Sequence, residues 1–251
     1  MKYVVLVATL ITLFSCNDDR ALILDNNILS EYLELNHFRE LSGLIACAGG
    51  KEGGLFNVQS ETSSIFFYPI EGAADFRYFE TDSLSDPSDF SQYRAKLIGS
   101  EPIFNGYLWK YNNPEFSGER YGVVTYKTEG RIHTCNPIRI KTNVKPTEQN
   151  PALMQIDEDG INPKFEWQDG VIDENAIYFQ VISDVDNNFV SGTYTFDQNF
   201  TFYNLDNVVL NISDTLSTPQ LEPDKRYTMT MMAVSEDNWV NLLIEKEFRT
   251  R

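Results

Sequence analysis

From residue 42 onward, the chain consists of short apolar and aromatic runs separated by residues typical of turns. In the first half these runs cover residues 64–70, 75–81, 92–98, 104–111, 121–127 and 131–141. Short strands at such regular spacing are typical of a β-sandwich, and an aromatic content of 13% favours strands as well. The sequence therefore predicts an all-β fold. Its hydrophobic content of 42% excludes a chain that is disordered throughout.

The second half repeats this pattern, with expected strands at residues 163–167, 176–183, 193–196, 201–203, 208–212 and 228–234. A polar segment without apolar residues, residues 145–151, separates the two halves. Because 251 residues suffice for about two domains of ordinary size, we place a domain boundary there. Ahead of the first strands, Leu29 and Leu33 recur at helical spacing, which predicts a short helix over residues 28–40.

Leu221, Pro223 and Tyr227 occur in the segment LEPDKRY, directly before an alternating strand. This pattern resembles the signature of fibronectin type III domains around their strands E and F. The resemblance implies that Leu221 closes the bottom of the core, that Pro223 fixes the corner, and that the buried Tyr227 bonds through its hydroxyl to upstream backbone. Trp167 and Tyr178 stand where the family has its strand B tryptophan and strand C tyrosine.

The fibronectin resemblance covers residues 152–251. The first half repeats its aromatic spacing weakly, with Phe66 and Tyr68 followed by Phe76 and Tyr78. It lacks the Leu-x-Pro step, and we expect an immunoglobulin-like sandwich there. The predicted fold class is two tandem immunoglobulin-like, fibronectin type III-like β-sandwiches preceded by a short helix.

The first residues, Met1 and Lys2, precede a nearly uninterrupted apolar run over residues 3–14. A bilayer core of about 30 Å needs about 20 apolar residues, so this run is too short to span it and is typical of a cleaved secretion signal. The end of the run, Leu13-Phe14-Ser15-Cys16, resembles the lipobox of bacterial lipoproteins, whose cysteine becomes the lipidated first residue. Phe14 departs from the small residue usual there, and an ordinary signal peptide cleaved elsewhere is the alternative.

Asn17, Asp18 and Asp19 follow the lipobox cysteine and resemble the export signal of Bacteroidota lipoproteins bound for the outer face of the outer membrane. The resemblance implies a lipid-anchored outer-membrane protein at the cell surface, with a periplasm-facing anchor as the alternative. The formal net charge of −17 repels nucleic-acid phosphates and excludes nucleic acid as a partner.

The expected organisation is therefore a signal peptide at residues 1–15 and a lipidated cysteine with a tether at residues 16–27. A helix with an immunoglobulin-like sandwich follows at residues 28–147, and a fibronectin type III-like sandwich at residues 148–251.

The chain carries no motif that indicates catalysis. Its two histidines, His37 and His133, lack a local motif, and the glycine-rich residues 49–54 lack the Gly-Lys-Ser/Thr end of a phosphate loop, which predicts a flexible loop. Residues 184–188 begin like a calcium loop but continue with Phe189 where glycine is required, which favours a hairpin turn. We expect no enzyme, no cofactor and no metal. Carboxylates at the domain junction keep a hydrolase as an alternative.

Tyr107, Trp109 and Tyr111 alternate, so on a strand their rings share one face and form a candidate ligand surface of the kind that stacks on sugars. Trp239, near the loop between the last two strands, is a second candidate. Inward-facing core aromatics or a contact between the domains explain the same positions equally well.

Three further features concern covalent chemistry. Cys47 and Cys135 lie in the expected first and last strands of the first sandwich, which can run side by side, so a disulfide is expected, with two buried thiols as the alternative. Ser83 and Thr215 follow Asp and precede Leu, and this resembles the O-glycosylation pattern of Bacteroidota.

These features predict a noncatalytic binding or spacer module of the cell envelope on the outer membrane. Its expected partners are the membrane, through the lipid anchor, and either a glycan or another envelope protein. A glycan-binding accessory lipoprotein of a polysaccharide-uptake system is the main alternative, since the aromatic row would serve it, and the hydrolase is the second.

Overall fold

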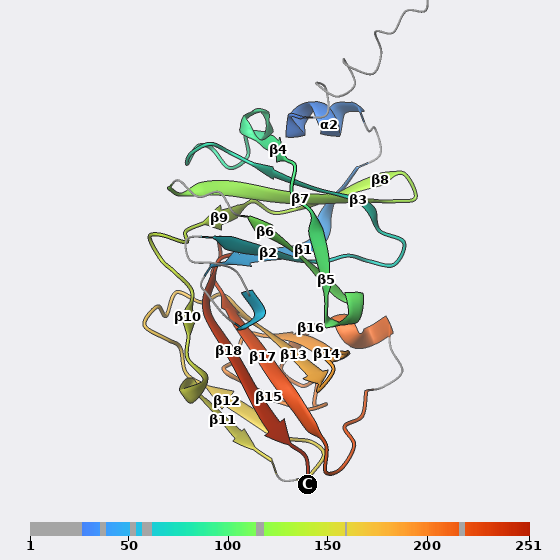
Figure 1. Ribbon diagram of the computed structural model, residues 1–251, viewed down its shortest axis with the longest axis vertical. Helices are drawn as coiled ribbons and strands as arrows, with labels where there is room; N and C mark the ends of the chain where they lie inside the picture. Colours follow the sequence, from blue (N-terminus) through green and yellow to red (C-terminus); the bar gives the residue numbers. More distant parts are fainter. Residues whose placement is uncertain are drawn as a thin grey trace, which may run out of the picture.

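The computed structural model describes residues 27–35, 39–50, 54–56, 62–113, 118–158, 160–215 and 219–251. Sheet layers follow one another along the long axis of the molecule, with helix α2 (Leu29–Leu35) at one end (Figure 1). Short 3₁₀ turns occur at η1 Gly54–Phe56, η2 Phe90–Gln92, η3 Phe104–Gly106, η4 Pro151–Leu153 and η5 Ile212–Thr215. No helix in the described part of the chain is long and apolar enough to cross a membrane.

The first sandwich contains β1 Arg39–Gly49, β2 Ser63–Tyr68, β3 Ala74–Glu80, β4 Arg94–Lys96, β5 Ser100–Ile103, β6 Leu108–Asn113, β7 Arg120–Thr128, β8 Arg131–Cys135 and β9 Ile138–Ile140. One sheet has the order β1-β2-β6-β5, and the other has the order β4-β3-β7-β8-β1, with β9 beside β7. Strand β1 belongs to both sheets, because its first part pairs with β8 in parallel and its last part pairs with β2. These orders match the ABED and CFG sheets of the immunoglobulin fold.

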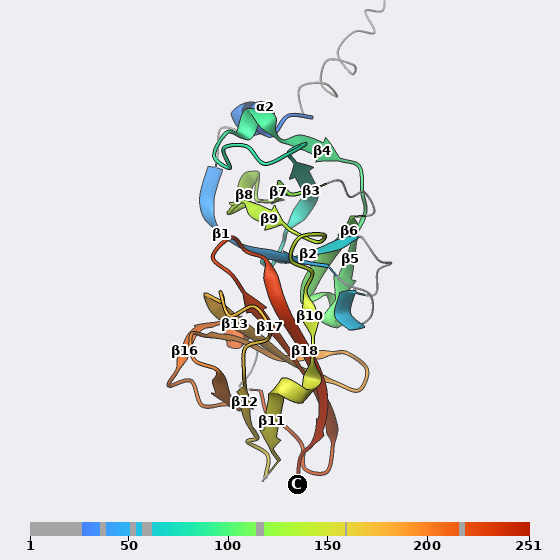
Figure 2. The same cartoon turned by 90° about the vertical axis from the view of Figure 1, so that its left-hand side faces the viewer.

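The second sandwich contains β10 Glu148–Gln149, β11 Met154–Asp157, β12 Lys164–Trp167, β13 Ile177–Asp184, β14 Phe189–Thr195, β15 Asn199–Thr201, β16 Val208–Asn211, β17 Arg226–Val234 and β18 Val240–Arg249. Its larger sheet has the order β10-β18-β17-β13-β14-β16, and its smaller sheet has the order β11-β12-β15. The chain is thus all-β, with two tandem immunoglobulin-like sandwiches, fibronectin type III-like in the second, preceded by a short helix. The turned view shows the same succession of layers (Figure 2).

The predicted helix is shorter than expected, and two predicted strands are not continuous. The strand expected over residues 131–141 is divided into β8 and β9. Helix α2 ends at Leu35, and β1 begins at Arg39, where the backbone pairs with β8 instead of continuing the helix. The strand expected over residues 104–111 is interrupted because Asn105 and Gly106 have positive φ angles of 55° and 85°. Left-handed backbone cannot continue a strand, so β5 and β6 are separate.

The core of the second sandwich confirms the fibronectin-like corner. Trp167 and Tyr178 pack edge to face in this core, with ring centroids 5.5 Å apart. Tyr227 is 7% exposed, and its hydroxyl accepts a hydrogen bond from the Glu222 N–H at 3.0 Å. Leu221 lies in the same core. The corner therefore ties the segment before β17 to the ring that anchors β17.

A buried carboxylate joins the strands of the first sandwich. The side chain of Glu80, on β3, is fully buried and forms ion pairs with Arg120 at 2.9 Å and Lys96 at 3.4 Å. It also accepts a hydrogen bond from the Tyr78 hydroxyl at 2.8 Å. Gly122 faces Glu80 across the ladder, and a Cβ there would lie 2.4 Å from the Tyr78 hydroxyl, so glycine leaves room for this network.

We expect Tyr227→Phe to lower the free energy of unfolding by about 1–2 kcal/mol, because the Glu222 N–H loses its acceptor in a partly buried corner. Denaturant unfolding of the whole protein measures this change. Tyr121→Phe is the matched control, since the Tyr121 hydroxyl makes no hydrogen bond within the described residues, and it should change stability by less than about 0.5 kcal/mol. An unchanged midpoint for Tyr227→Phe would contradict the role of the corner.

Candidate functional site

A third apolar core lies between the two sandwiches. The outer face of the β1-β2-β6 sheet packs against the outer face of the sheet that contains β13, β14, β17 and β18. Its buried members are Phe56, Phe66, Phe104, Leu108, Phe179, Val181, Tyr194, Ile212, Met232, Val234, Val240 and Leu243. Because these side chains leave water together, the two domains are joined by the same hydrophobic effect that stabilises each of them.

Strand β17 shows how the sequence encodes this contact. Met229 and Met231 point into the core of the second sandwich, whereas Met232 and Val234 belong to the core between the domains. Successive side chains of a strand face opposite sides, so a strand that is buried on both faces is apolar at nearly every position. The central strands of the larger sheet of the second sandwich are therefore buried on both faces.

The aromatic row predicted at Tyr107, Trp109 and Tyr111 does not form one exposed face. Tyr107 precedes β6, stacks on Phe189 at a centroid distance of 3.7 Å and donates a hydrogen bond to the backbone of the second sandwich. Tyr111 is 1% exposed in the first core, and the partly buried Trp109 packs on Phe76 with centroids 4.8 Å apart. The left-handed residues of η3 break the expected alternation, and the rings serve core and domain contacts instead of a sugar-stacking surface.

Trp239 is fully buried, although it belongs to the turn between β17 and β18 of the second sandwich. Its ring lies in the core of the first sandwich, and its indole N–H donates to the Lys145 carbonyl at 2.8 Å. The neighbouring Asn238 carbonyl accepts from the N–H of Ala48 on β1 at 3.0 Å. Trp239 is therefore an anchor between domains, as one of the two sequence interpretations held, and not an exposed ligand contact.

The segment between the domains is fixed on both sides. Thr147 accepts a hydrogen bond from the Gly50 N–H at 3.0 Å and donates one to the Val240 carbonyl at 2.7 Å. A Cβ on Gly50 would lie 2.7 Å from the Thr62 carbonyl oxygen. The prediction of a flexible glycine loop is thus wrong for Gly49, which ends β1, and for Gly50, while residues 51–53 lie outside the described residues.

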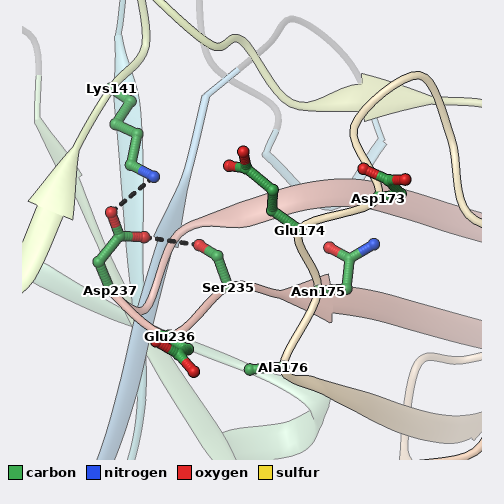
Figure 3. A pocket seen from close by; sticks show the side chains of 8 residues that line it. All are labelled: Lys141, Asp173, Glu174, Asn175, Ala176, Ser235, Glu236 and Asp237. Carbon is green, nitrogen blue, oxygen red and sulfur yellow. Dashed lines mark hydrogen bonds and ion pairs between the residues drawn. The ribbon is translucent and has the colours of Figure 1, made fainter.

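A cavity of about 490 Å³ opens where the linker meets the turn between β17 and β18. Figure 3 shows Lys141 paired with Asp237 on one side of the cavity and Glu174 and Asp173 further across it. Asp237 pairs with Lys141 at 2.6 Å and accepts a hydrogen bond from the Ser235 hydroxyl at 2.6 Å. Glu174 pairs with Lys145 at 2.6 Å.

These carboxylates are candidates for the hydrolase alternative at the domain junction. The hydrogen bond and the charge of Lys145 lower the pKa of Glu174, which keeps it ionised. A glycosidase pair instead needs one carboxyl group that stays protonated near neutral pH. The geometry of this cavity therefore favours ion pairs that hold the linker on the second sandwich.

Two further candidates lie in the described chain. His133 is buried, stacks on Tyr126 at 4.9 Å, and its Nε2 lies 2.6 Å from the Thr128 hydroxyl. Residues 184–188 form the hairpin turn that was expected, with the Asp184 carboxylate accepting the N–H groups of Asp186 and Asn188. Within the described residues, no group of three or more His, Cys, Asp or Glu residues is placed to hold a metal ion.

Several predicted sites remain untested by the structure. Ser83 is exposed in the segment after β3, and Thr215 ends η5. O-glycosylation at both positions stays a prediction. The leader (residues 1–15), the lipobox cysteine Cys16, the export residues Asn17, Asp18 and Asp19, and His37 lie outside the described residues.

The predicted disulfide is absent, since Cys47 and Cys135 are free thiols. The strand pairing behind that prediction is present: β1 and β8 run in parallel, with Leu44 opposite Cys135. Cys47 lies three residues further along β1, where the strand pairs with β2. Its side chain faces the core between the domains, whereas Cys135 faces the core of the first sandwich. Opposite faces of one sheet cannot be joined by a disulfide.

No protein-family model matches the sequence, and no curated protein matches it. Among solved structures, 75 chains match. One of them is the FN1–FN3 domains of chicken CNTN1, at 12% sequence identity and a TM-score of 0.29, covering 76% of this chain. The match spans 60% of that chain's length. A likeness at this TM-score carries no argument, and the fold class rests on the strand topology described above.

We expect neither internal thiol to react in the folded protein at about pH 8, because burial raises the pKa of both to about 12 and the thiolate is the reactive form. Thiol titration of a Cys16→Ser variant should find no rapid reaction under native conditions and two reactive thiols in denaturant without reductant. Zero thiols in denaturant would mean that the bridge forms after all.

Proposed function

We propose that this protein is a noncatalytic, lipid-anchored module of the cell envelope that acts as a rigid two-domain spacer on the outer membrane. The anchor rests on the lipobox-like Leu13-Phe14-Ser15-Cys16 and the acidic residues that follow it. The spacer role rests on the third core, which packs the two sandwiches against each other beside their linker. Tandem domains joined by a flexible linker would move independently.

The junction is fixed by three kinds of contact, and this observation carries the proposal. Apolar side chains of both domains form one buried cluster. Trp239 inserts from the second domain into the core of the first. Thr147 of the linker bonds to Gly50 and Val240, one on each domain. A rigid two-domain body holds its far end at a set distance from its anchor.

The direction of the spacer follows from helix α2. Buried Leu29, Tyr32 and Leu33 attach α2 to the first sandwich, and Figure 1 shows α2 at the opposite end of the long axis from β11 and β12. A tether of residues 17–26 reaches at most about 35 Å. A lipid on Cys16 would keep the first sandwich next to the membrane and direct the second one outward.

The glycan-binding alternative loses its main support, because Tyr111 and Trp239 are buried and Tyr107 stacks on Phe189. Binding of an envelope protein by the outer end of the second sandwich fits a spacer better than sugar stacking does. The hydrolase alternative gains no support from Glu174, because the hydrogen bond and charge of Lys145 lower the pKa of this carboxyl group.

Spin labels on the two domains test rigidity. Leu97 is 100% exposed in the first domain and Val171 is 91% exposed in the second, so Leu97→Cys and Val171→Cys can be labelled in a Cys16→Ser background. We expect one narrow distance distribution by double electron–electron resonance. Adding Trp239→Ala should broaden it and destabilise the protein by about 3–5 kcal/mol. Tyr227→Phe, which weakens only the second sandwich, should leave the distribution narrow, whereas a broad distribution with Trp239 intact would refute rigidity.

Mass spectrometry of the mature N-terminus tests the anchor. We expect the natural chain, expressed with its leader in a diderm bacterium, to begin at Cys16 with acyl chains attached, and Cys16→Ala to release the protein from membranes. Protease treatment of intact cells separates the cell surface from the periplasm. Cleavage elsewhere, with an unmodified Cys16, would refute the anchor and the localisation while leaving the rigid body untouched.

A further inference from the structure

A second cavity, of about 430 Å³, lies at the rim of the core between the domains. It lies at the edge of the area in which the first sandwich covers the outer face of β17 and β18. Leu55, Ile103 and Phe104 of the first domain form one wall, and Ser183, Thr230 and Glu245 of the second contribute to the other. Its size falls within the range of small-ligand sites in proteins.

The strand register explains why the cavity is polar on one side. Met232 faces Leu243 across β17 and β18, and both belong to the core between the domains. Thr230 lies two residues before Met232, on the same face of β17, and it pairs with Glu245 of β18. The outer face of β17 and β18 thus changes from apolar to polar where the first sandwich no longer covers it.

Glu245 is a half-buried carboxylate without a cationic partner. Its Oε2 accepts a hydrogen bond from the Leu55 N–H at 2.8 Å, and within the described chain it forms no ion pair. Burial raises the pKa of Glu245, and only the Leu55 hydrogen bond opposes this. The fully buried Glu80 differs, because Arg120 and Lys96 balance its charge. A carboxylate that loses hydration without gaining a counter-charge is stabilised by a cation that binds beside it.

The other lining residues suit the same kind of ligand. They include the carboxylate of Asp186 and the carboxamides of Asn105, Asn187 and Asn188, and the described lining contains no Lys or Arg. Ser183 is 1% exposed, and its hydroxyl has no hydrogen-bond partner among the residues that the structure describes. The cavity thus combines acceptor groups and negative charge with an apolar wall.

We propose that this cavity binds a primary ammonium or guanidinium group carried on a short alkyl stem, with the charge at Glu245 and the stem against Ile103 and Phe104. The acceptors and the apolar wall match the two parts of such a ligand. A lysine or arginine side chain of a partner peptide and a free alkylamine share this chemistry. The proposal does not rest on the lipid anchor, but like the spacer role it requires that the two domains stay docked, because both domains line the cavity.

Titration by NMR tests the proposal, with the amide signals of Ser183, Asn188 and Thr230 as reporters. The probes are N-acetyl-lysine methylamide, its arginine counterpart, n-butylamine, and N-acetyl-norleucine methylamide as the uncharged isostere. We expect saturable shifts with the charged probes and none with norleucine. Stronger binding of the acetylated amino acids than of butylamine would identify a peptide side chain as the ligand. Equal binding would identify a free amine.

Glu245→Gln should weaken binding of the lysine probe about tenfold to a hundredfold, because the glutamine can still accept the Leu55 N–H but carries no charge. Glu247→Gln is the matched control: it removes the same charge two residues along β18, on the same face but outside the cavity lining. It should bind as the unchanged protein does.

Asp186→Asn, in an exposed turn where folding is not at risk, should weaken binding about two- to fivefold. Equal affinity for norleucine, equal affinity of Glu245→Gln and the unchanged protein, or no shift with any charged probe would each overturn the proposal. Rigidity of the domains, measured separately by the spin labels, is unaffected by any of these results.

Discussion

The burial of two sheet faces against each other is the contact on which the rest of this molecule depends. A β-sandwich normally keeps its outer faces polar, because only its inner faces meet. Here the outer face of β1, β2 and β6 and that of β13, β14, β17 and β18 are both apolar, and each would be an exposed hydrophobic patch without the other. Folding of either domain alone would leave such a patch in water. Each sandwich is therefore stabilised by packing against its neighbour.

The sequence predicted local chemistry better than it predicted which surfaces meet. Leu221, Pro223 and Tyr227 identified the corner before β17, because all three lie within one segment of seven residues. The prediction of a row at Tyr107 failed because three consecutive residues with positive φ, Phe104, Asn105 and Gly106, place the first ring outside the strand. The third core did leave a signal, the apolar residues at both odd and even positions in β17, but periodicity does not say which partner covers the second face.

The cysteines show the same difference: the sequence predicted which strands pair, but not which face of the sheet each thiol occupies. The expected neighbourhood of the first and last strands is real, and the topology of an immunoglobulin-like sandwich made it predictable. Which face each thiol occupies depends on register, and a shift of one residue exchanges the two faces. Ala46 and Ala48 point into the first core, so Cys47 between them must point away from Cys135. Glu245 was missed for a related reason, since nothing in a single strand tells a solvated glutamate from one at the rim of a domain contact.

Two glutamates illustrate what burial does to charge in this fold. Glu80 lies deep in one sandwich, where the cationic side chains of Arg120 and Lys96 form ion pairs with it. Glu245 lies where the third core ends, beside apolar side chains that reduce its hydration but do not neutralise it. The low-polarity wall that strengthens attraction to a cation is supplied by the first domain, and the carboxylate by the second. A site of this kind exists only while the domains stay docked, so the contact between the two sandwiches also builds the cation site that we propose at Glu245.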